Sequence, residues 1–508
     1  MKYQDIYIRD ILIDGRGVGE TPDKVAFIEG AIFGEVCEIE IIEEKKNFYN
    51  AKKIKTIKES PYQTQAPCPY FYECGACTIM DIKYEKQLEI KKNLIIQALA
   101  KSTSYKLDDI EIIPSKELRY RNKIRLQVDK DGSLAYNKSY SNDLVYIKDC
   151  LLAKENIGEN LVEIETITRN IAGAYPSIIK EITIRTNGKD IMLNLDLLDN
   201  KDAISYINER YSTSKFYINI IGRENINISG CDYLDYEIFD KTFRISSNDF
   251  YQVNDFQIEN LYGEAKKILG EGKKVLDLYC GSATSSIAIN GDNLVGVEIN
   301  KNAIKDAKIN AEKNNLKDYK FIAKNAKYID EKFIKKEKID SLIVDPPRAG
   351  LDKDLIKAIG KSGLKEIIYI SCNPQTLARD INRFEKQGYK LEKIKAVDMF
   401  PQTMHVETIA LLSKLDVDKH INIEIELDEL DLTSAESKAT YAQIKEYVWN
   451  KFELKVSTLY IAQIKRKCGI ELREHYNKSK KEKQIIPQCT PEKEEAIMDA
   501  LRHFKMIW

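Results

Sequence analysis

The sequence predicts an α/β protein built around a doubly wound parallel sheet, and three observations support this fold class. From about residue 255 to residue 415, short apolar segments alternate with helical patterns, as in parallel strands joined by crossover helices. The segments end in polar or reactive side chains, as strands beside a ligand site do. The chain has 508 residues, too many for one core, so further domains are expected on both sides of the sheet.

The strands of this sheet are predicted at 274–279, 294–298, 319–323, 339–344 and 366–371, with helices between them, for example at 301–315. Before the sheet, "IYIRDILIDG" and "EVCEIEII" alternate apolar and polar residues between glycine-rich turns, which predicts a small β-barrel over 1–59. Residues 60–250 are expected to form an α+β central domain, with a cysteine-bearing loop at 60–78 and a helix at 84–100. The parallel sheet then occupies 251–415.

The last part of the chain, 416–508, is predicted to be an acidic linker and a helical extension. Residues 416–436 hold eight acids and one lysine. Helical patterns begin near Ser434, Ser457 and Thr490. The first two, at 434–453 and 457–467, suggest a helix-turn-helix-like pair beside the basic stretch 451–483. This pattern fits an accessory RNA-binding domain, and it also fits a solvated helical cap.

Composition limits the class of protein. Hydrophobic residues make up 43% and charged residues 31% of the chain, and the net charge is −1. No apolar run reaches the about 18 residues of a membrane span, and "MKYQDIYIRDILIDG" does not resemble a signal peptide, so a cytoplasmic protein without membrane contact is expected. Ten cysteines in such a chain favour metal or catalytic use over disulfides. Nucleic-acid binding would depend on local basic patches.

The strand ends predict a cofactor site. The first strand ends in "LDLYCGSAT", with Tyr279 and Gly281, and Glu298 follows nineteen residues after Tyr279. A carboxylate at this spacing hydrogen-bonds the ribose of an adenosine cofactor. A nicotinamide dehydrogenase would need G-x-G-x-x-G, whereas 281–286 read G-S-A-T-S-S. One glycine suits S-adenosylmethionine, which has no pyrophosphate. Asn325, Asp345 and Cys372 follow the next three strands.

Six motifs carry a family resemblance: "FYQVN" (250–254), "LDLYCGSAT", "VGVEIN", "VDPPRAG" (344–350), "ISCNP" and "HVET" (405–408). In order and spacing they resemble the RumA/TrmA-type RNA uracil-C5 methyltransferases, over roughly residues 1–413. The resemblance implies a Rossmann-like S-adenosylmethionine-dependent methyltransferase domain and a front barrel similar to the OB-like TRAM domain. Two positions depart from the family pattern: Ala283 replaces a usual glycine, and Asn325 replaces a common aspartate.

The resemblance also implies the chemistry. Uracil C5 is a poor nucleophile until a thiolate adds to C6, so the reaction needs a cysteine and a base near C5. Cys372 resembles the nucleophile, and its place between a strand and a helix predicts a thiolate. Glu407 resembles the base, and Asp345 the residue that binds the uracil edge. Gln252 resembles the residue that contacts donor and base, and Tyr279 the residue that lines the donor pocket.

Two related classes are excluded by the motif after the fourth strand. RNA cytosine-C5 enzymes carry a cysteine there, whereas this chain reads "DPPRAG". Amino-methyltransferases place an aromatic residue after D/N-P-P, whereas Arg348 follows here, and they have no need of Cys372.

A cysteine pattern predicts a metal site. Cys68, Cys74 and Cys77 have the spacing C-x5-C-x2-C in a Pro/Gly-containing loop, and Cys150 is the proposed fourth ligand. Four thiolates can hold zinc or a [4Fe–4S] cluster, and spacing alone does not decide between them. The resemblance implies the [4Fe–4S] cluster, because a subset of the family has the same arrangement.

The iron–sulfur subgroup implies 23S ribosomal RNA as the substrate, with tRNA as the second candidate. The expected chain is a monomer that binds no DNA and no membrane. A catalytically silent RNA-binding or chaperone module is the alternative from another class, and the presence of Cys372 and Glu407 argues against it. The target base must leave its stack to reach a thiol, so the substrate is expected to be unpaired RNA.

Overall fold

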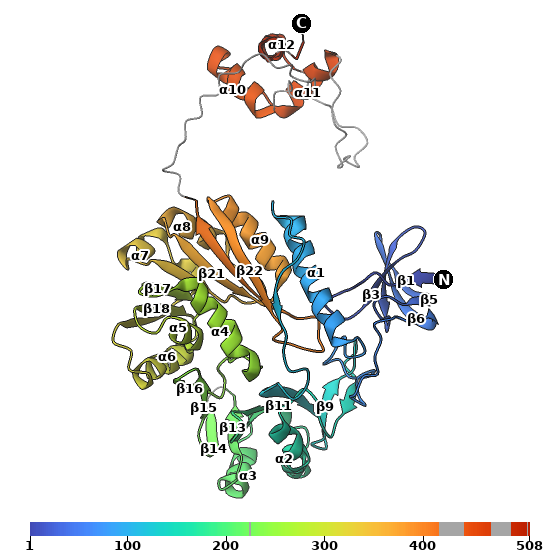
Figure 1. Cartoon of the computed structure of the whole chain (residues 1–508), viewed down its shortest axis with the longest axis vertical. Coiled ribbons are helices and arrows are strands. Elements are labelled where there is room, and N and C mark those ends of the chain that lie inside the picture. Colours follow the sequence, from blue (N-terminus) through green and yellow to red (C-terminus); the bar gives the residue numbers. More distant parts are fainter. Residues whose placement is uncertain (223–224, 416–440, 469–488, 505, 508) are drawn as a thin grey trace. The chain divides into compact units, whose positions relative to one another are not determined.

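The computed structural model describes residues 1–222, 225–415, 441–468, 489–504 and 506–507. The chain divides into two compact units, Met1–Val417 and Asp418–Trp508, and each is described by itself. The first unit contains three large sheets and one hairpin (Figure 1). Within the described ranges, no helix combines the length and the apolar character needed to span a bilayer.

The N-terminal sheet has six strands in the order β1-β5-β6-β4-β3-β2. Its strands are β1 (Lys2–Tyr7), β2 (Asp10–Ile11), β3 (Gly17–Glu20), β4 (Val25–Glu29), β5 (Val36–Glu44) and β6 (Phe48–Lys58). Ala26 and Ile28 of β4, and Cys37 and Ile39 of β5, are buried at every second position. The alternation therefore gives this sheet one apolar face, and closure of the segment into a TRAM-like barrel stays a prediction.

The second sheet has seven strands in the order β10-β9-β8-β11-β12-β13-β14. The strands are β8 (Lys123–Val128), β9 (Leu134–Asn137), β10 (Leu144–Tyr146), β11 (Ile179–Thr186), β12 (Ile191–Leu197), β13 (Tyr217–Ile221) and β14 (Ile226–Ser229). Helix α2 (Glu155–Ala174) packs against β11, and α3 (Lys201–Tyr211) packs against β14. The hairpin β15 (Tyr233–Ile238) and β16 (Lys241–Ser246) leads into the third sheet.

The third sheet has eight strands in the order β19-β18-β17-β20-β21-β23-β22-β7. The strands are β7 (Ile112–Ile113), β17 (Val275–Leu278), β18 (Leu294–Glu298), β19 (Tyr319–Ala323), β20 (Ser341–Val344), β21 (Glu366–Ser371), β22 (Tyr389–Val397) and β23 (Glu407–Lys414). The five predicted strands, β17 to β21, are confirmed as parallel. Strand β23 extends the sheet antiparallel to β21 and β22.

Helices cover the third sheet (Figure 1). They are α1 (Tyr84–Ser102), α4 (Asp255–Leu269), α5 (Thr284–Ile289), α6 (Lys301–Lys313), the 3-10 helix η1 (Ala326–Tyr328), α7 (Glu331–Lys336), α8 (Lys353–Ser362) and α9 (Pro374–Glu385). Helix α1 was predicted from periodicity, but its packing was not. It lies against α9, with Ile95 and Leu99 in the core of the third sheet. A helix that precedes the third sheet in the sequence therefore packs in the core of that sheet.

The second unit contains α10 (Tyr441–Phe452), α11 (Thr458–Lys467) and α12 (Pro491–His503) around its own apolar core. The predicted starts of the last two helices are confirmed: Ser457 caps α11 by accepting a hydrogen bond from the Tyr460 amide at 3.2 Å, and Pro491 opens α12. The start near Ser434, the acidic stretch 416–436 and much of the basic stretch 451–483 lie outside the described residues.

Candidate functional site

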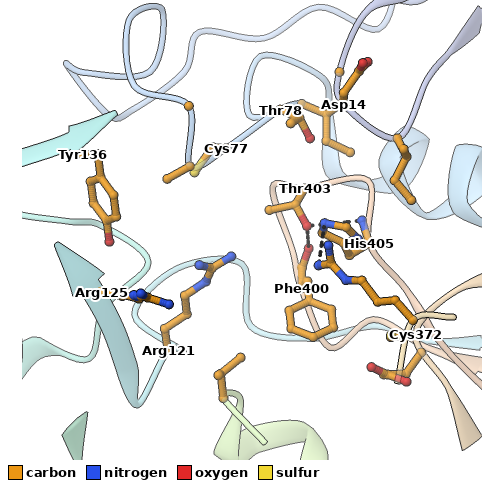
Figure 2. A pocket seen from close by; sticks show the side chains of 18 of the residues that line it. Asp14, Cys77, Thr78, Arg121, Arg125, Tyr136, Cys372, Phe400, Thr403 and His405 are labelled. Atoms are coloured by element: carbon orange, nitrogen blue, oxygen red, sulfur yellow. Dashed lines mark hydrogen bonds between the residues drawn. The ribbon is translucent and has the colours of Figure 1, made fainter. Parts of the chain in front are cut away.

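All of the residues predicted to bind the donor or to carry out the chemistry line one cavity of about 1980 Å³ in the first unit. They are Gln252, Tyr279, Gly281, Glu298, Asn325, Asp345, Cys372 and Glu407. Strands β17, β18, β20 and β21 are parallel, so their carboxyl ends meet at one edge of the sheet and bring together Glu298, Asp345 and Cys372. Figure 2 shows Cys372 and His405 on one side of this space and Arg121, Arg125 and Tyr136 on the other.

The ends of β17 and β18 form the side of the cavity where the donor is predicted to bind. The Glu298 carboxylate accepts hydrogen bonds from the amides of Gly281 at 3.3 Å and Asn300 at 2.8 Å. The next side chain, Ile299, is 65% exposed and lines the same cavity. An anchored carboxylate beside an apolar surface can hold the hydroxyls of a ribose and the face of an adenine.

The turn after β17 has an unusual backbone. Tyr279, Gly281 and Ala283 all have positive φ, at 69°, 52° and 61°. For a residue with a Cβ atom, this left-handed conformation costs roughly 1–2 kcal/mol. Ala283 is also where the sequence departs from the family's usual glycine, so the departure carries a strain that glycine would avoid.

Cys372 lies at the corner between β21 and α9. The next residue, Asn373, caps α9 by accepting hydrogen bonds from the amides of Gln375 at 3.1 Å and Thr376 at 3.4 Å. Burial, together with the nearby carboxylates of Glu407 and Asp345, raises the pKa of the Cys372 thiol to about 11, although Arg348 lowers it. The prediction that this corner favours a thiolate is therefore wrong for the ligand-free site.

Two acidic side chains lie beside this thiol. Asp345 follows β20, and Glu407 begins β23, which pairs Thr408 with Ser371, the neighbour of Cys372. Burial raises the pKa of Asp345 to about 7, and burial together with Asp345 raises the pKa of Glu407 well above its usual range. Among the described residues, the Glu407 Oε2 atom has no hydrogen-bond partner, although the side chain is only 3% exposed. A carboxyl group in this state is poised for proton transfer with a ligand.

Sequence reasoning assigned no role to two further residues of this cavity, Arg348 and His405. The guanidinium of Arg348 lowers the pKa values of both Cys372 and Glu407, so it favours their anionic forms. Its Nη2 atom lies 3.5 Å from His405 Nε2, and burial, with Arg348 next, lowers the pKa of His405 to about 4. His405 is therefore neutral near pH 7. Both residues lie inside motifs that the sequence contains, "DPPRAG" and "HVET", and could have been found there.

Helix α1 holds the segment that leads to Glu407. Lys91 donates to Asp398 Oδ1 at 2.6 Å in an ion pair with both side chains fully buried, and also to the Phe400 carbonyl at 3.1 Å. The Tyr84 hydroxyl donates to the other Asp398 oxygen at 2.8 Å. Breaking a buried pair of this kind leaves an uncompensated charge, so these contacts fix the backbone between β22 and β23.

The four predicted metal ligands gather in one region. Cys68, Cys77 and Cys150 pack against a small apolar cluster of Met80, Tyr120 and Leu152. Cys74 and Cys150 belong to the adjoining core of the second sheet. Burial raises the pKa of Cys74 to about 11 and the pKa values of Cys68 and Cys77 in the same direction, and Cys150 adds to all three shifts. In the part of the chain that the structure describes, no group of three or more His, Cys, Asp or Glu side chains could hold a metal ion as placed.

The chain is similar in sequence and in structure to known RNA methyltransferases. A family model described as tRNA (Uracil-5-)-methyltransferase matches residues 83–415. Uncharacterized RNA methyltransferases of Listeria innocua and Clostridium acetobutylicum are each 32% identical to the chain, covering 80% and 81% of it and 96% and 97% of their own lengths. The crystal structure of the Pyrococcus abyssi tRNA (uracil-54, C5)-methyltransferase with S-adenosyl-L-homocysteine is 25% identical, has a TM-score of 0.64, and covers 81% of this chain and 100% of its own. The fold, the cavity and these matches together place the chain in the tRNA (uracil-5-)-methyltransferase family.

Proposed function

We propose that the protein transfers a methyl group from S-adenosylmethionine to C5 of a uridine in RNA, through a covalent bond between Cys372 and C6. The observation that carries this proposal is the single cavity that holds Cys372, Asp345 and Glu407 beside the donor-side residues. Family membership supports the reaction, and the solved relative with bound S-adenosyl-L-homocysteine supports the donor.

The residues of the site fit this donor. Glu298 would hold its ribose, Ile299 and Asn325 its adenine, and Gln252, Tyr279, Gly281 and Asp345 its methionine part, since all of them line the cavity. When bound, S-adenosylmethionine supplies the methyl group and a positive charge on sulfur. A positive charge beside Asp345 and Cys372 favours their anionic forms, so the high thiol pKa of the ligand-free site would fall.

The protein's own residues would carry the remaining steps. The Cys372 thiolate adds to C6 of the uracil, and the electron pair of the C5–C6 double bond moves to C5 and O4. Asp345 holds the uracil edge. After C5 has received the methyl group, Glu407 as carboxylate removes the C5 proton, and the returning electron pair expels the thiolate from C6. Arg348 lowers the pKa values of both Cys372 and Glu407, which favours the forms that act.

The size of the cavity supports an RNA substrate. Its volume of about 1980 Å³ exceeds the roughly 300–1,000 Å³ of small-molecule sites. It is lined by four cations that form no ion pair with any described residue, and these are Lys52, Arg121, Lys138 and Arg348. The Tyr72 ring is 71% exposed at the same cavity and could stack on a base. These features suit an unpaired RNA segment with its target base turned outward.

We propose 23S ribosomal RNA as the substrate, in a chain with a TRAM-like domain at 1–59, a central domain at 60–250, a methyltransferase domain at 251–415 and an accessory helical domain at 416–508. The N-terminal six-stranded sheet and the cysteine loop support this assignment through the resemblance of the sequence to the iron–sulfur subgroup. A tRNA target is the second candidate, because the family description and the solved relative name tRNA.

Mapping of 5-methyluridine in RNA from cells with and without the gene distinguishes the two targets. We expect a methylated uridine in 23S rRNA to disappear on deletion, while tRNA keeps all its methylated uridines. Loss of a tRNA methyluridine alone would assign the protein to tRNA, and unchanged methylation in both RNAs would favour the silent RNA-binding or chaperone module.

We also propose that Cys68, Cys74, Cys77 and Cys150 hold a [4Fe–4S] cluster. The donor set fits, because Cys68 and Cys77 of the loop pack with Cys150 against one small apolar cluster, and Cys74 lies with Cys150 in the core of the second sheet. The raised pKa values of Cys68, Cys74 and Cys77 mean that binding of the cluster must release protons from these thiols.

Protein purified without air is expected to be brown and to contain about four irons per chain, as measured by absorbance and elemental analysis. Replacing Cys68 with serine should lower the iron content sharply. The matched control is Cys37→Ser, a buried cysteine of the N-terminal sheet, which should leave iron bound. A colourless, active protein that contains zinc would contradict the iron–sulfur assignment.

A further inference from the structure

The loop between β22 and β23 runs from 398 to 406 and ends at Glu407, which pairs with Val397. At the tip of this loop, Gln402 has φ of +68° and is 3% exposed. A non-glycine residue stays in this conformation only where its surroundings hold it there. The tip of the loop is therefore a constrained point, and its contacts determine where the following residues lie.

The contacts to this loop come from Thr78 and Ile79, which directly follow Cys77 of the cysteine-bearing loop. The amides of Thr78 and Ile79 donate to the Gln402 carbonyl at 3.1 and 3.3 Å. The Thr78 hydroxyl oxygen accepts from the Met404 amide at 3.1 Å. One residue, Thr78, therefore contacts the loop on both sides of Thr403.

A buried amide locks the same two segments together. Gln87 of α1 is 1% exposed, and its Nε2 atom donates to Gln402 Oε1 at 2.8 Å and to the Ile79 carbonyl at 3.0 Å. Its Oε1 atom accepts from the Gln402 amide at 3.1 Å. Hydrogen bonds between the buried side chains of Gln87 and Gln402 therefore stabilise the contact between the two loops.

The contacts at Gln402 also determine where the cavity-lining residues Thr403 and His405 lie. Thr403 donates its hydroxyl to the Phe400 carbonyl at 2.9 Å and accepts from the His405 amide at 3.3 Å. Thr403, His405 and Glu407 all line the cavity, and Figure 2 shows Thr78 next to Thr403 and His405. A shift at Thr78 would therefore move the residues that face the uracil.

We propose that Thr78 is a positioning residue for proton removal: it holds the loop that places Glu407 against C5 of the methylated base. This inference rests on the proposed role of Glu407. It also gives the cysteine segment a mechanical role, because Thr78 directly follows Cys77. Thiol addition depends on Cys372 at the end of β21, an element outside this loop, so the early steps should be spared.

The test uses Thr78→Val, which keeps the shape of the side chain but removes the oxygen that binds the Met404 amide. The assay is a single turnover with S-adenosylmethionine and unmodified 23S rRNA transcribed in vitro, or with transcribed tRNA if mapping assigns the target to tRNA. Release of methylated RNA should slow about tenfold, because a small misplacement of a catalytic group slows the step that it catalyses. The covalent protein–RNA complex should accumulate on a denaturing gel. Because the slowed step follows formation of the covalent complex, kcat and the KM for RNA should fall together, and kcat/KM should not change.

Two further variants show whether the effect is one of positioning. Thr78→Ser keeps the oxygen and should restore normal turnover without accumulation of the complex. Thr168→Val removes the hydroxyl of a fully buried threonine of α2, which donates to the Gly132 carbonyl at 2.6 Å. Thr168 lies outside the cavity, so this variant should lose thermal stability without accumulating the complex.

The outcomes separate the two proposals. If Glu407→Gln accumulates no complex, the role of Glu407 itself is overturned. If Glu407→Gln accumulates the complex but Thr78→Val releases product as fast as Thr168→Val, only the positioning role of Thr78 is overturned. A raised KM for RNA with unchanged release would show that Thr78 contacts RNA directly, which also contradicts the inference.

Discussion

Replacing Cys372 with alanine is expected to abolish methyl transfer while S-adenosylmethionine still binds. The thiol contacts the base in the proposed mechanism, whereas the donor is held by residues at the ends of β17 and β18. Loss of a catalytic nucleophile typically lowers turnover by about 10⁴-fold or more. The measurements are methyl incorporation into RNA and calorimetric titration of the donor.

The control for this variant is Cys37→Ala. Cys37 is a fully buried cysteine in β5 of the N-terminal sheet, so its replacement tests the general effect of losing a buried thiol. It should retain methyl transfer. Turnover by Cys372→Ala near the rate of the unmodified protein would show that Cys372 is not the nucleophile.

Replacing Glu407 with glutamine gives a different result, because addition and methylation precede proton removal. Glutamine keeps the size of the side chain but cannot accept the C5 proton. We expect the methylated RNA to remain bound to Cys372, visible as a slowly migrating band on a denaturing gel, with turnover lowered by about 10²–10⁴-fold.

The matched variant is Glu111→Gln, a carboxylate paired with Lys395 of β22 and away from the cavity, which should turn over normally. Normal turnover by Glu407→Gln would assign proton removal to another base. Asp345 would then be the nearest candidate, since it lines the same cavity and burial raises its pKa to about 7.

The sequence was sufficient to predict the part of the site that depends on strand ends. Strands β17 to β21 have strong local patterns, and parallel pairing places Glu298, Asp345 and Cys372 at one edge whatever surrounds them. Glu407 could be assigned only through the "HVET" motif, because its place beside Cys372 depends on antiparallel pairing of β23 with β21.

Other features depend on contacts between distant segments, which local patterns do not reveal. The packing of α1 against α9 and the Lys91–Asp398 pair join residues about 300 positions apart in the chain. The state of the Cys372 thiol was predicted wrongly for a similar reason. A strand–helix corner lowers a thiol pKa, but burial and the carboxylates of Glu407 and Asp345 raise it, and these come from elsewhere in the chain.

The covalent bond between Cys372 and C6 is the central claim, and RNA containing 5-fluorouridine tests it most directly. Fluorine at C5 cannot leave as a cation, so the reaction should stop after methylation with the RNA still attached to the protein. Digestion and mass spectrometry should find a methylated fluorouridine on the peptide that contains Cys372. Absence of any adduct under conditions in which ordinary RNA is methylated, or an adduct on another residue, would contradict the proposed mechanism.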